Sequence, residues 1–341
     1  MTEYSQDITH PKHSIRVSAP ARLHLGFLDL NGSSGRKFGS IGLAINTHQT
    51  VIEVRHADEL CFEGVSSTST QQKVTKLVSE FYRTIGQGID EICRGVEITI
   101  KQLIPEHSGL GSGTQLALSV GTALSKLHNI STSTPLLAAA LGRGARSGVG
   151  IKNFDQGGFV VDAGLGIQSS VPALISHFTF PEHWRIVLLL DQQHQGVHGT
   201  TESNAFKTLP TFPLTQSQAI CHLTLMKLLP AVVEQNIRSF GEAVTAIQQL
   251  IGDHFAPAQG GRYTSAKVES LLEYSQKLGY YGIAQSSWGP TGCVFVEDEG
   301  TAQKLVTDLQ TQANKLFDTD QQLSFCIAKA NANGANIDMI T

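Results

Sequence analysis

The sequence has little charge and no long hydrophobic run. Only 16% of its 341 residues are charged, compared with roughly a quarter in average chains, and the net charge is −4. Such a weak negative charge gives no overall attraction to nucleic acid or acidic membranes. The longest apolar runs, such as 186–190, are far too short to span a bilayer, and the first residues carry no apolar signal segment. We therefore expect a compact cytoplasmic protein without nucleic-acid or membrane partners.

Cysteine is sparse and lacks any metal-binding spacing. The five cysteines are scattered along the chain, and no two of them form a CxxC pair. We expect reduced thiols packed in the core. Cys221 and His222 are adjacent, which could indicate a nucleophile with its base, but the pattern around them favours an amphipathic helix.

Short segments rich in Val, Ile and Thr predict strands in the first half of the chain, over 14–19, 41–45, 50–55 and 96–103. Apolar residues spaced by three and four after residue 115 predict a helix. Ser133 or Thr134 followed by Pro135 predicts the start of a second helix. The glycine-rich stretch 142–164 is predicted to be a long loop that feeds a strand.

The second half has a different pattern, with a soft domain boundary near residue 182. A buried strand is predicted at 185–191, a mostly helical region at 219–251 with a break near Pro230, and a glycine-rich hinge at 257–261. The remaining predicted elements are a helix at 265–278, a turn and strand at 286–298, a helix at 301–317 and a strand at 323–329. This order favours an α+β fold over a doubly wound sheet.

Residues 105–115 read PEHSGLGSGTQ and join a predicted strand to a predicted helix. Glycine permits positive φ and close approach of backbone N–H groups, and a helix N-terminus adds partial positive charge, so a phosphate is the ligand that suits this loop. It is not a Walker A loop, since no Gly-Lys-Ser/Thr follows. Taken alone, such a loop favours a tight strand-to-helix turn that binds nothing.

Three stretches resemble, in order, the three motifs of the galactokinase, homoserine, mevalonate and phosphomevalonate (GHMP) kinase superfamily: SAPARLHLGFLDLNG, PEHSGLGSGTQLAL and QSSWGPTG. Together with GSIGLAI, GRGARSGVGI and FDQGGFVVDAG, they are more similar to the β-ribofuranosylaminobenzene 5′-phosphate (β-RFAP) synthases. The resemblance implies a two-domain GHMP kinase fold of the α+β class. Its N-terminal domain, like ribosomal protein S5 domain 2, would cover 1–182, and its ferredoxin-like C-terminal domain would cover 183–341.

The resemblance also implies a condensation that needs no ATP. Phosphoribosyl pyrophosphate would join 4-hydroxybenzoate or 4-aminobenzoate, releasing CO₂ and pyrophosphate, in an early step of tetrahydromethanopterin biosynthesis. Mg²⁺ is the implied cofactor and a homodimer the implied assembly. Two alternatives stay open: an ATP-dependent small-molecule kinase of the same fold, and a non-catalytic relative that binds phosphate ligands.

A leaving pyrophosphate needs hydrogen-bond donors and a metal to carry its charge. The resemblance places it on the glycine loop, with the Ser112 hydroxyl as a metal ligand and with Ser287 and Gly289 closing on the loop. The implied loop residues are Gly109, Leu110, Gly111, Ser112, Gly113 and Thr114. Family kinases commonly have a second serine where this chain has Gly113, which argues against ordinary kinase chemistry.

Two acidic residues are candidates for catalysis. Asp155 lies where superfamily kinases carry an acidic residue that helps to activate the substrate hydroxyl, so it could hold Mg²⁺ or stabilise a ribose cation. It could also be a simple turn residue. Glu106, at the entrance of the glycine loop, could contact metal or ribose, or merely favour the helix N-terminus.

Positive charge must meet the 5′-phosphate and the acceptor carboxylate, and guanidinium groups suit both anions. Arg22 and Arg146 are the first candidates. The other candidates in the matched stretches are Arg36, Arg143 and Lys152. His24 is either a core histidine or a hydrogen-bonding group of the site.

Some further positions have open roles. His194 and His198 have a spacing seen in zinc sites, although Gly196 argues against the helix that would align them. They could instead line an acceptor pocket with Glu202. Trp288 could stack on the aromatic acceptor or simply pack in the core.

Overall fold

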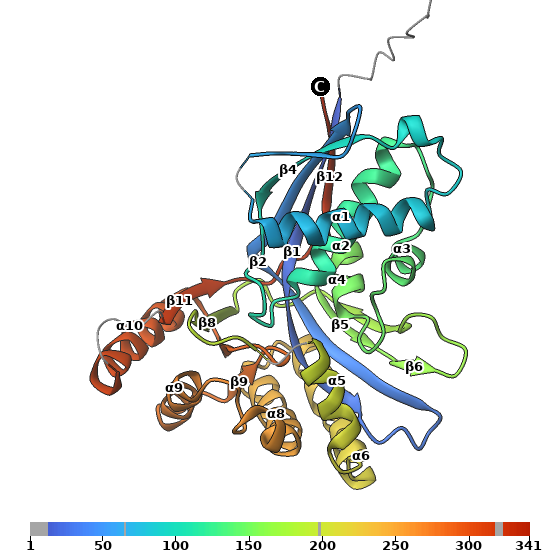
Figure 1. Ribbon diagram of the computed structural model, residues 1–341. Helices are drawn as coiled ribbons and strands as arrows, with labels where there is room; N and C mark the ends of the chain where they lie inside the picture. The colour runs from blue at the N-terminus through green and yellow to red at the C-terminus, as the bar shows by residue number, and fades with distance from the viewer. Residues whose placement is uncertain (1–12, 65, 197–198, 318–322) are drawn as a thin grey trace, which may run out of the picture.

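Two sheets with helices packed on them form the two lobes of the molecule (Figure 1). This computed structural model describes residues 13–64, 66–196, 199–317 and 323–341. One sheet has eight strands and the other has four. The mixed content of helix and sheet confirms the expected α+β class. None of the helices in these ranges is both long and apolar enough to cross a membrane.

The first lobe is built on two long antiparallel strands, β1 (Ser14–Asp29) and β2 (Arg36–His56). The sequence predicted two short strands where β2 runs continuously. The path through the sheet is β12-β1-β2-β4-β3, and β5 and β6 also pair with β2. The other strands are β3 (Cys61–Glu63), β4 (Val96–Gln102), β5 (Phe159–Asp162), β6 (Leu165–Gly166), β7 (Leu174–Phe178) and β12 (Asn336–Ile340).

Four α-helices belong to the first lobe: α1 (Thr68–Arg83), α2 (Ser112–Leu127), α3 (Thr134–Ala140) and α4 (Val149–Gln156). A short 3₁₀ turn covers Glu91–Cys93. The predictions of α2 and α3 are confirmed. The loop predicted over 142–164 is wrong in part, because α4 forms inside it. Ile151 and Phe154, three residues apart, pack in the core and give this helix its buried face.

The second lobe has the ferredoxin-like topology that was expected. Its strands are β8 (Arg185–Asp191), β9 (Gly282–Gln285), β10 (Thr291–Val296) and β11 (Leu323–Ala328), all antiparallel in the order β11-β8-β10-β9. Because side chains alternate along a strand, Val187 and Leu189 pack with α9 (Ala266–Lys277) and α10 (Glu299–Leu316), whereas Ile186 and Leu188 join the core shared with β1 and β2.

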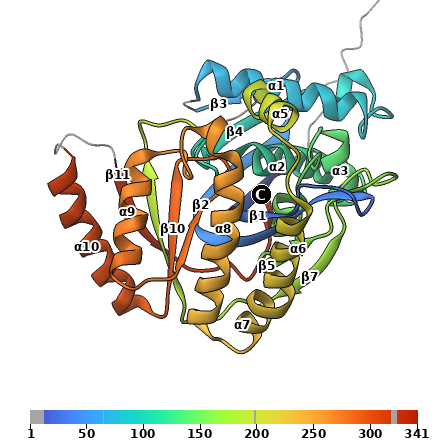
Figure 2. The same cartoon turned by 90° about the horizontal axis from the view of Figure 1, so that it is seen from below.

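Helix α8 (Ile237–Gln259) lies beside the second sheet, next to β10 in Figure 2, and its side chains bind the open edge of β9. Thr245 Oγ1 accepts a hydrogen bond from the N–H of Ile283 at 3.1 Å, and Gln248 Oε1 accepts from the N–H of Gln285 at 2.9 Å. The edge N–H groups of β9 are therefore satisfied by helix side chains. The predicted hinge over 257–261 begins too early, because α8 continues past Pro257 to Gln259.

Three shorter helices follow β8: α5 (Gly199–Thr208), α6 (Leu214–Leu223) and α7 (Leu229–Val233). A π-helical turn over Thr224–Leu228 joins α6 to α7. Pro230 follows it and has no N–H to donate to the preceding turn, which accounts for the irregularity that the sequence predicted there.

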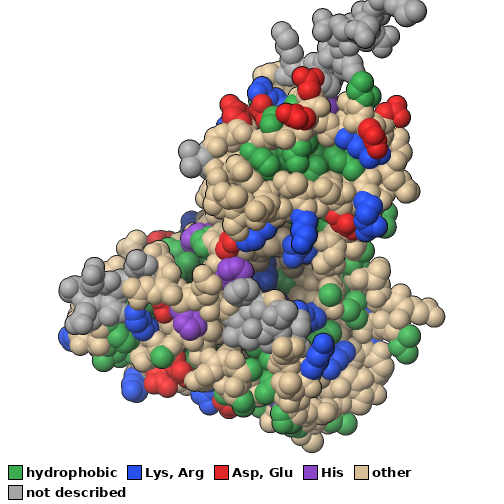
Figure 3. All heavy atoms as spheres, viewed as in Figure 1, with side chains coloured by type: hydrophobic (Ala, Val, Ile, Leu, Met, Phe, Trp, Pro, Cys, Tyr) green, Lys and Arg blue, Asp and Glu red, His purple; other side chains and the backbone are tan. Residues whose placement is uncertain are grey.

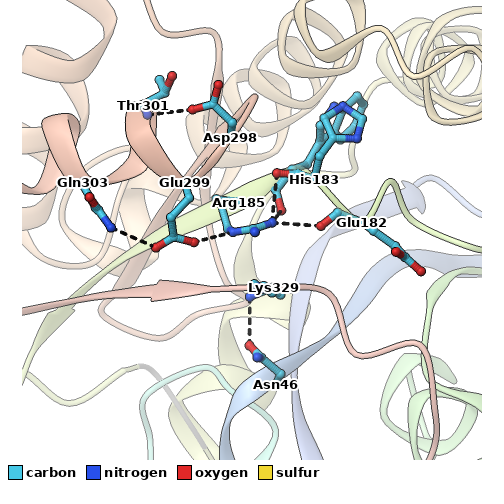
Figure 4. A network of polar contacts seen from close by, with 10 residues as sticks. Asn46, Glu182, His183, Arg185, Asp298, Glu299, Thr301, Gln303 and Lys329 are labelled. Atoms are coloured by element: carbon cyan, nitrogen blue, oxygen red, sulfur yellow. Dashed lines mark hydrogen bonds and ion pairs between the residues drawn. The ribbon is translucent and has the colours of Figure 1, made fainter.

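The chain passes from the first sheet to the second between β7 and β8, close to the predicted boundary at residue 182. Arg185 Nε donates to Glu299 at 2.6 Å, and its Nη1 donates to the carbonyl of Glu182 at 2.8 Å (Figure 4). The Lys329 N–H donates to Asn46 Oδ1 at 2.8 Å, which joins β11 to β2. Beyond this point β12 returns to pair with β1. The predicted C-terminal domain over 183–341 is therefore incorrect at its end, since its last strand belongs to the first sheet.

Candidate functional site

Three segments that are far apart in the sequence meet at the start of α2. The N–H of Arg22 in β1 donates to the carbonyl of Leu110 at 3.0 Å. The hydroxyl of Ser286, in the turn after β9, donates to the carbonyl of Gly109 at 2.7 Å. The first and third of the motif stretches are thus both hydrogen-bonded to the second.

The glycines of this junction are required by conformation and by space. Gly109 has φ +84°, and a Cβ there would lie 2.1 Å from the carbonyl oxygen of Ser286. A Cβ on Gly289 would lie 2.2 Å from the N of Gly109. Gly111, at φ +91°, is the N-cap of α2 and has no side chain to cap it. The first N–H groups of α2 consequently remain for an anion.

A pocket of about 240 Å³ opens in front of this helix N-terminus; we call it the glycine-loop pocket. Figure 3 shows Lys and Arg side chains gathered where the surface is hollowed between the lobes. The residues that line the pocket are Arg22, His107, Gly109, Gly111, Ser112, Gly113, Thr114, Arg143, Gly196, Glu202, Ser287, Trp288 and Gly289. Most of the predicted loop residues and both predicted residues of the third motif are therefore brought together. Leu110 is fully buried and does not line the pocket.

Arg22 supplies a half-buried cation to the glycine-loop pocket. Burial lowers the pKa of its guanidinium to about 10, and the nearby carboxylate of Glu202 opposes this shift. The side chain therefore stays protonated at neutral pH. Its Nη1 donates to the carbonyl of Gly109, which holds the guanidinium beside the loop. The prediction that Arg22 belongs to the site is supported by this geometry.

Arg146 was predicted to reach the pocket directly, but it lies behind Glu202. Its Nη1 is 2.8 Å from Glu202 Oε1, and its guanidinium lies 4.9 Å from the ring centre of Phe206 in α5. It does not line the glycine-loop pocket. Arg146 thus acts on the pocket through Glu202, which it orients and partly neutralises.

Arg143 is the cation that sequence reasoning ranked too low. It lines the glycine-loop pocket, and a Cβ on Gly113 would lie 3.4 Å from its Nη1. Its side chain makes no hydrogen bond or ion pair with the part of the chain that the structure describes, and its Nε is buried without a partner. Burial lowers the pKa of its guanidinium. An unpaired, desolvated guanidinium next to a helix N-terminus is suited to an anionic ligand.

A second and larger pocket, of about 530 Å³, lies on the other side of Ser112 and Gly113; we call it the leucine pocket. Its lining residues are Thr50, Lys73, Lys76, Leu77, Glu80, Leu103, Ile104, Glu106, His107, Ser112, Gly113, Leu116, Leu141 and Arg143. Glu106 pairs with Lys73 at 2.6 Å here. The sequence analysis missed α1 and with it both lysines, although Val74, Leu77 and Phe81 have helical spacing.

Asp155 is not brought to the glycine loop. It is exposed near the end of α4 and lines a separate pocket with Thr122 and Ser125, in the second half of α2. Thr122 follows Ser112 by ten residues, which at the helical rise corresponds to about 15 Å. The metal and catalytic roles predicted for Asp155 therefore have no geometric support. The reason is that α4 is a helix, which carries residue 155 away from the loop.

His24 also lies outside the glycine-loop pocket. Burial is the main cause that lowers the pKa of its imidazole to about 3, so the ring is neutral at physiological pH. The ring packs edge-on against Phe27 at 4.8 Å. Its backbone carbonyl accepts from the N–H of Ser287 at 2.9 Å. His24 therefore fixes the turn after β9 rather than transferring protons.

The contacts of three further candidates are explained by the fold itself. Trp288 is nearly buried, and its ring centre lies 4.5 Å from that of Phe255. Packing in the core therefore accounts for most of the contacts of its side chain. Arg36 donates to the carbonyl of Ala163 at 2.9 Å and lines neither pocket. Burial raises the pKa of Cys221, which argues against a reactive thiol.

The predicted zinc pair cannot be assigned. His194 is exposed, and His198 lies outside the described residues. Within the described ranges, no three His, Cys, Asp or Glu side chains converge as a metal cage would require. Lys152, on α4, lines neither pocket.

Asp162 holds the segment that carries the site arginines. It is fully buried at the end of β5, where its carboxylate accepts from the N–H groups of Gly148 and Gly164, both at 2.8 Å. Gly148 ends the stretch that contains Arg143 and Arg146. Burial is the main cause that raises the pKa of Asp162 to about 6, despite the lowering effect of these hydrogen bonds.

We expect this carboxylate to make stability fall between about pH 4 and pH 6. A raised native pKa means that the folded chain binds a proton that the unfolded chain has released, so the favourable term is present at low pH and lost as pH rises through about 6. The change amounts to about 3 kcal/mol at most. Urea midpoints measured at several pH values should show a flatter profile for Asp162→Asn than for wild type. Asp253→Asn, at an exposed ion pair, is the control, and equal slopes for wild type and Asp162→Asn would contradict the assignment.

Comparison with known proteins agrees with this architecture. The family model described as GHMP kinases N terminal domain matches residues 72–160, and the one described as GHMP kinases C terminal matches residues 228–315. The structure superimposes on homoserine kinase from Cytophaga hutchinsonii with a TM-score of 0.64 and 17% identity, over 99% of this chain and 100% of that one. Mevalonate diphosphate decarboxylase from Staphylococcus aureus gives a TM-score of 0.66 with 17% identity, over 95% and 98% of the two chains.

Closer sequence relatives share one name. The β-ribofuranosylphenol 5′-phosphate synthase of Methanocaldococcus jannaschii is 33% identical over 320 residues, covering 89% of this chain and 93% of the relative. The synthase of the same name from Archaeoglobus fulgidus is 35% identical over 290 residues, covering 81% and 86%. A third, from Methanothermobacter thermautotrophicus, is 31% identical over 80% of this chain and 86% of the relative.

Proposed function

Because the chain belongs to the β-ribofuranosylphenol 5′-phosphate synthase family on the GHMP kinase fold, we propose that this enzyme joins phosphoribosyl pyrophosphate to 4-hydroxybenzoate or 4-aminobenzoate. The observation that carries the proposal is the identity of 31–35% to three synthases over most of the chain. The products are the ribosylated phenol or aniline 5′-phosphate, CO₂ and pyrophosphate. Tetrahydromethanopterin biosynthesis is the pathway proposed for it.

The proposed reaction balances without ATP or an external proton donor. The bond between ribose C1 and pyrophosphate breaks, and its electron pair leaves with the pyrophosphate. Ribose C1, now cationic in character, forms a bond with the ring carbon that bears the carboxylate. The carboxylate then leaves as CO₂, and its bonding electrons restore the aromatic ring. The site must therefore stabilise negative charge that grows on pyrophosphate.

The glycine-loop pocket supplies that stabilisation. The first N–H groups of α2, at Ser112 and Gly113, face the leaving group, and Gly111 offers no competing cap. Arg22 adds a fixed positive charge in a desolvated position, where it costs no reorganisation during the reaction. Glu202 also lines the pocket and can interact with the ribose cation or its hydroxyl groups.

The residues present are compatible with Mg²⁺, which proteins commonly hold through one or two carboxylates together with substrate phosphates. Ser112 lines both pockets, and Glu106, which pairs with Lys73, lines the leucine pocket beside it. Their hydroxyl and carboxylate are the groups that would hold the ion. Asp155 is too far away to take part. When bound, Mg²⁺ would carry part of the charge on the leaving pyrophosphate. The homodimer stays a prediction from the family resemblance, and the cytoplasmic location stays a prediction from the sequence.

The decisive experiment is an assay of purified protein with phosphoribosyl pyrophosphate, Mg²⁺ and carboxyl-labelled 4-hydroxybenzoate or 4-aminobenzoate, without ATP. CO₂ and pyrophosphate should be released in equal amounts. Asp155→Asn should keep kcat/KM within about twofold of wild type, as expected of a surface substitution. Release of neither product, with ATP consumed in the presence of another acceptor, would instead support a kinase of the same fold.

A further inference from the structure

The leucine pocket differs in chemistry from the glycine-loop pocket. Leu77 of α1, Leu116 of α2 and Leu141 at the end of α3 contribute apolar side chains that are nearly buried. Leu103 and Ile104 extend this apolar wall from the segment after β4. The charged residues on the α1 side, Lys73, Lys76 and Glu80, lie on one helix. A flat aromatic ring is suited to the apolar wall of this pocket.

The two pockets meet at four residues, which are His107, Ser112, Gly113 and Arg143. Ligands that occupy both pockets would therefore approach one another beside the N-terminus of α2. The glycine-loop pocket contains the half-buried cation Arg22 and the first N–H groups of the helix, so it is the better place for phosphoribosyl pyrophosphate. The leucine pocket is then left for the second substrate.

The proposed chemistry restricts how that substrate can lie. The new bond forms at the ring carbon that carries the carboxylate, so the carboxylate must be next to ribose C1, at the junction of the pockets. Arg143 lies there, and its guanidinium has no partner within the described residues. The hydroxyl or amino group in the para position must point the opposite way, away from the junction.

We propose that the leucine pocket is the acceptor subsite, which holds the ring of a 4-substituted benzoate among Leu77, Leu116 and Leu141 with its carboxylate turned toward Arg143. This inference rests on the proposed function. It makes the leucine side chains the determinants of acceptor size. Arg143 orients the carboxylate, and as CO₂ departs the same guanidinium stays beside the pyrophosphate, on which the negative charge remains.

The test is to enlarge the pocket and offer a larger acceptor. For Leu141→Ala, we expect the ratio of kcat/KM for 3-methyl-4-hydroxybenzoate to kcat/KM for 4-hydroxybenzoate to rise about tenfold. This is the low end of the discrimination that one methylene group gives in an apolar pocket. KM for phosphoribosyl pyrophosphate should stay within about twofold of wild type. Leu272→Ala, in the core of the second lobe, is the matched control, because it removes an equally buried leucine far from the pocket. It should leave acceptor preference unchanged.

A second variant covers the possibility that Leu141→Ala does not fold. Leu103→Phe, at a half-buried position, should narrow the pocket and raise KM for 4-hydroxybenzoate about tenfold with little effect on phosphoribosyl pyrophosphate. A rise in KM for phosphoribosyl pyrophosphate instead would overturn the proposal and place the ribose phosphate in the leucine pocket. Unchanged constants for both substrates would also overturn it. Failure of the proposed function is distinguishable, because wild type would then form no product.

Discussion

Arg22→Met is expected to lower kcat/KM by about 10²–10³-fold, the usual loss when one fixed donor to a developing charge is removed. Arg22 is a half-buried cation that lines the glycine-loop pocket. Methionine has a similar length without the charge. The Gly109 carbonyl loses one donor but keeps the Ser286 hydroxyl at 2.7 Å, so the loop stays attached. Steady-state kinetics with both substrates, together with thermal melting, measures the effect.

A matched arginine separates this loss of charge from a structural effect. Arg94 also donates to a backbone carbonyl, that of Ile89 at 2.9 Å, and lies over the ring of Tyr82, but it is outside both pockets. Arg94→Met should lower the melting temperature slightly and leave kcat/KM near that of wild type. Equal losses of activity in the two variants would show that Arg22 is a structural clamp and not part of the anion site.

The glycine loop could be predicted from sequence because its requirements are local. Positive φ and close backbone approach select glycine at positions 109 and 111 whatever the rest of the chain does. That the other two motif stretches lie against this loop could be predicted only from the family resemblance. The hydrogen bonds from Arg22 and Ser286 to the loop explain that convergence physically.

The ranking of the charged residues could not be predicted in the same way. Arg143 and Arg146 are three residues apart in an irregular segment, so their directions depend on how Asp162 and Gly148 fix that segment. Arg143 faces the pockets, whereas Arg146 pairs with Glu202. Asp155 was misplaced for a similar reason. Its glycine-rich surroundings favoured a loop, but packing of Ile151 and Phe154 in the core made the segment helical.

The return of β12 to the first sheet illustrates a longer-range limit. Strand pairing between residues 14–18 and 336–340 depends on contacts across nearly the whole chain, and no local pattern contains that information. β12 is also only five residues long, and its side chains are mostly exposed, so it contributes little to the core. By contrast, α1 could have been found from sequence, because Val74, Leu77 and Phe81 are spaced as one face of a helix.

Gly109→Ala is expected to reduce kcat/KM by about 10²-fold or more, because small displacements of catalytic groups have effects of that size. A Cβ at this position would lie 2.1 Å from the carbonyl of Ser286 and 2.9 Å from the Cα of Gly289. Both neighbours are backbone atoms, so the turn after β9 must move away from the loop. The side of the glycine-loop pocket formed by Ser287 and Gly289 would move with it. Both kcat/KM, from steady-state kinetics, and the affinity for pyrophosphate, from calorimetry, should fall.

Gly279→Ala shows how much of that loss comes from backbone strain alone. Gly279 has φ +93°, similar to the +84° of Gly109, but a Cβ there would meet nothing within 4 Å. The left-handed conformation costs an L-residue about 1–2 kcal/mol, so both variants should lose stability. Only Gly109→Ala should lose pyrophosphate binding, since only there does the added carbon push two motif segments apart. If both variants keep full pyrophosphate affinity, close contact between the loop and the turn is not needed for anion binding, and the site must depend on Arg22 and Arg143 without it.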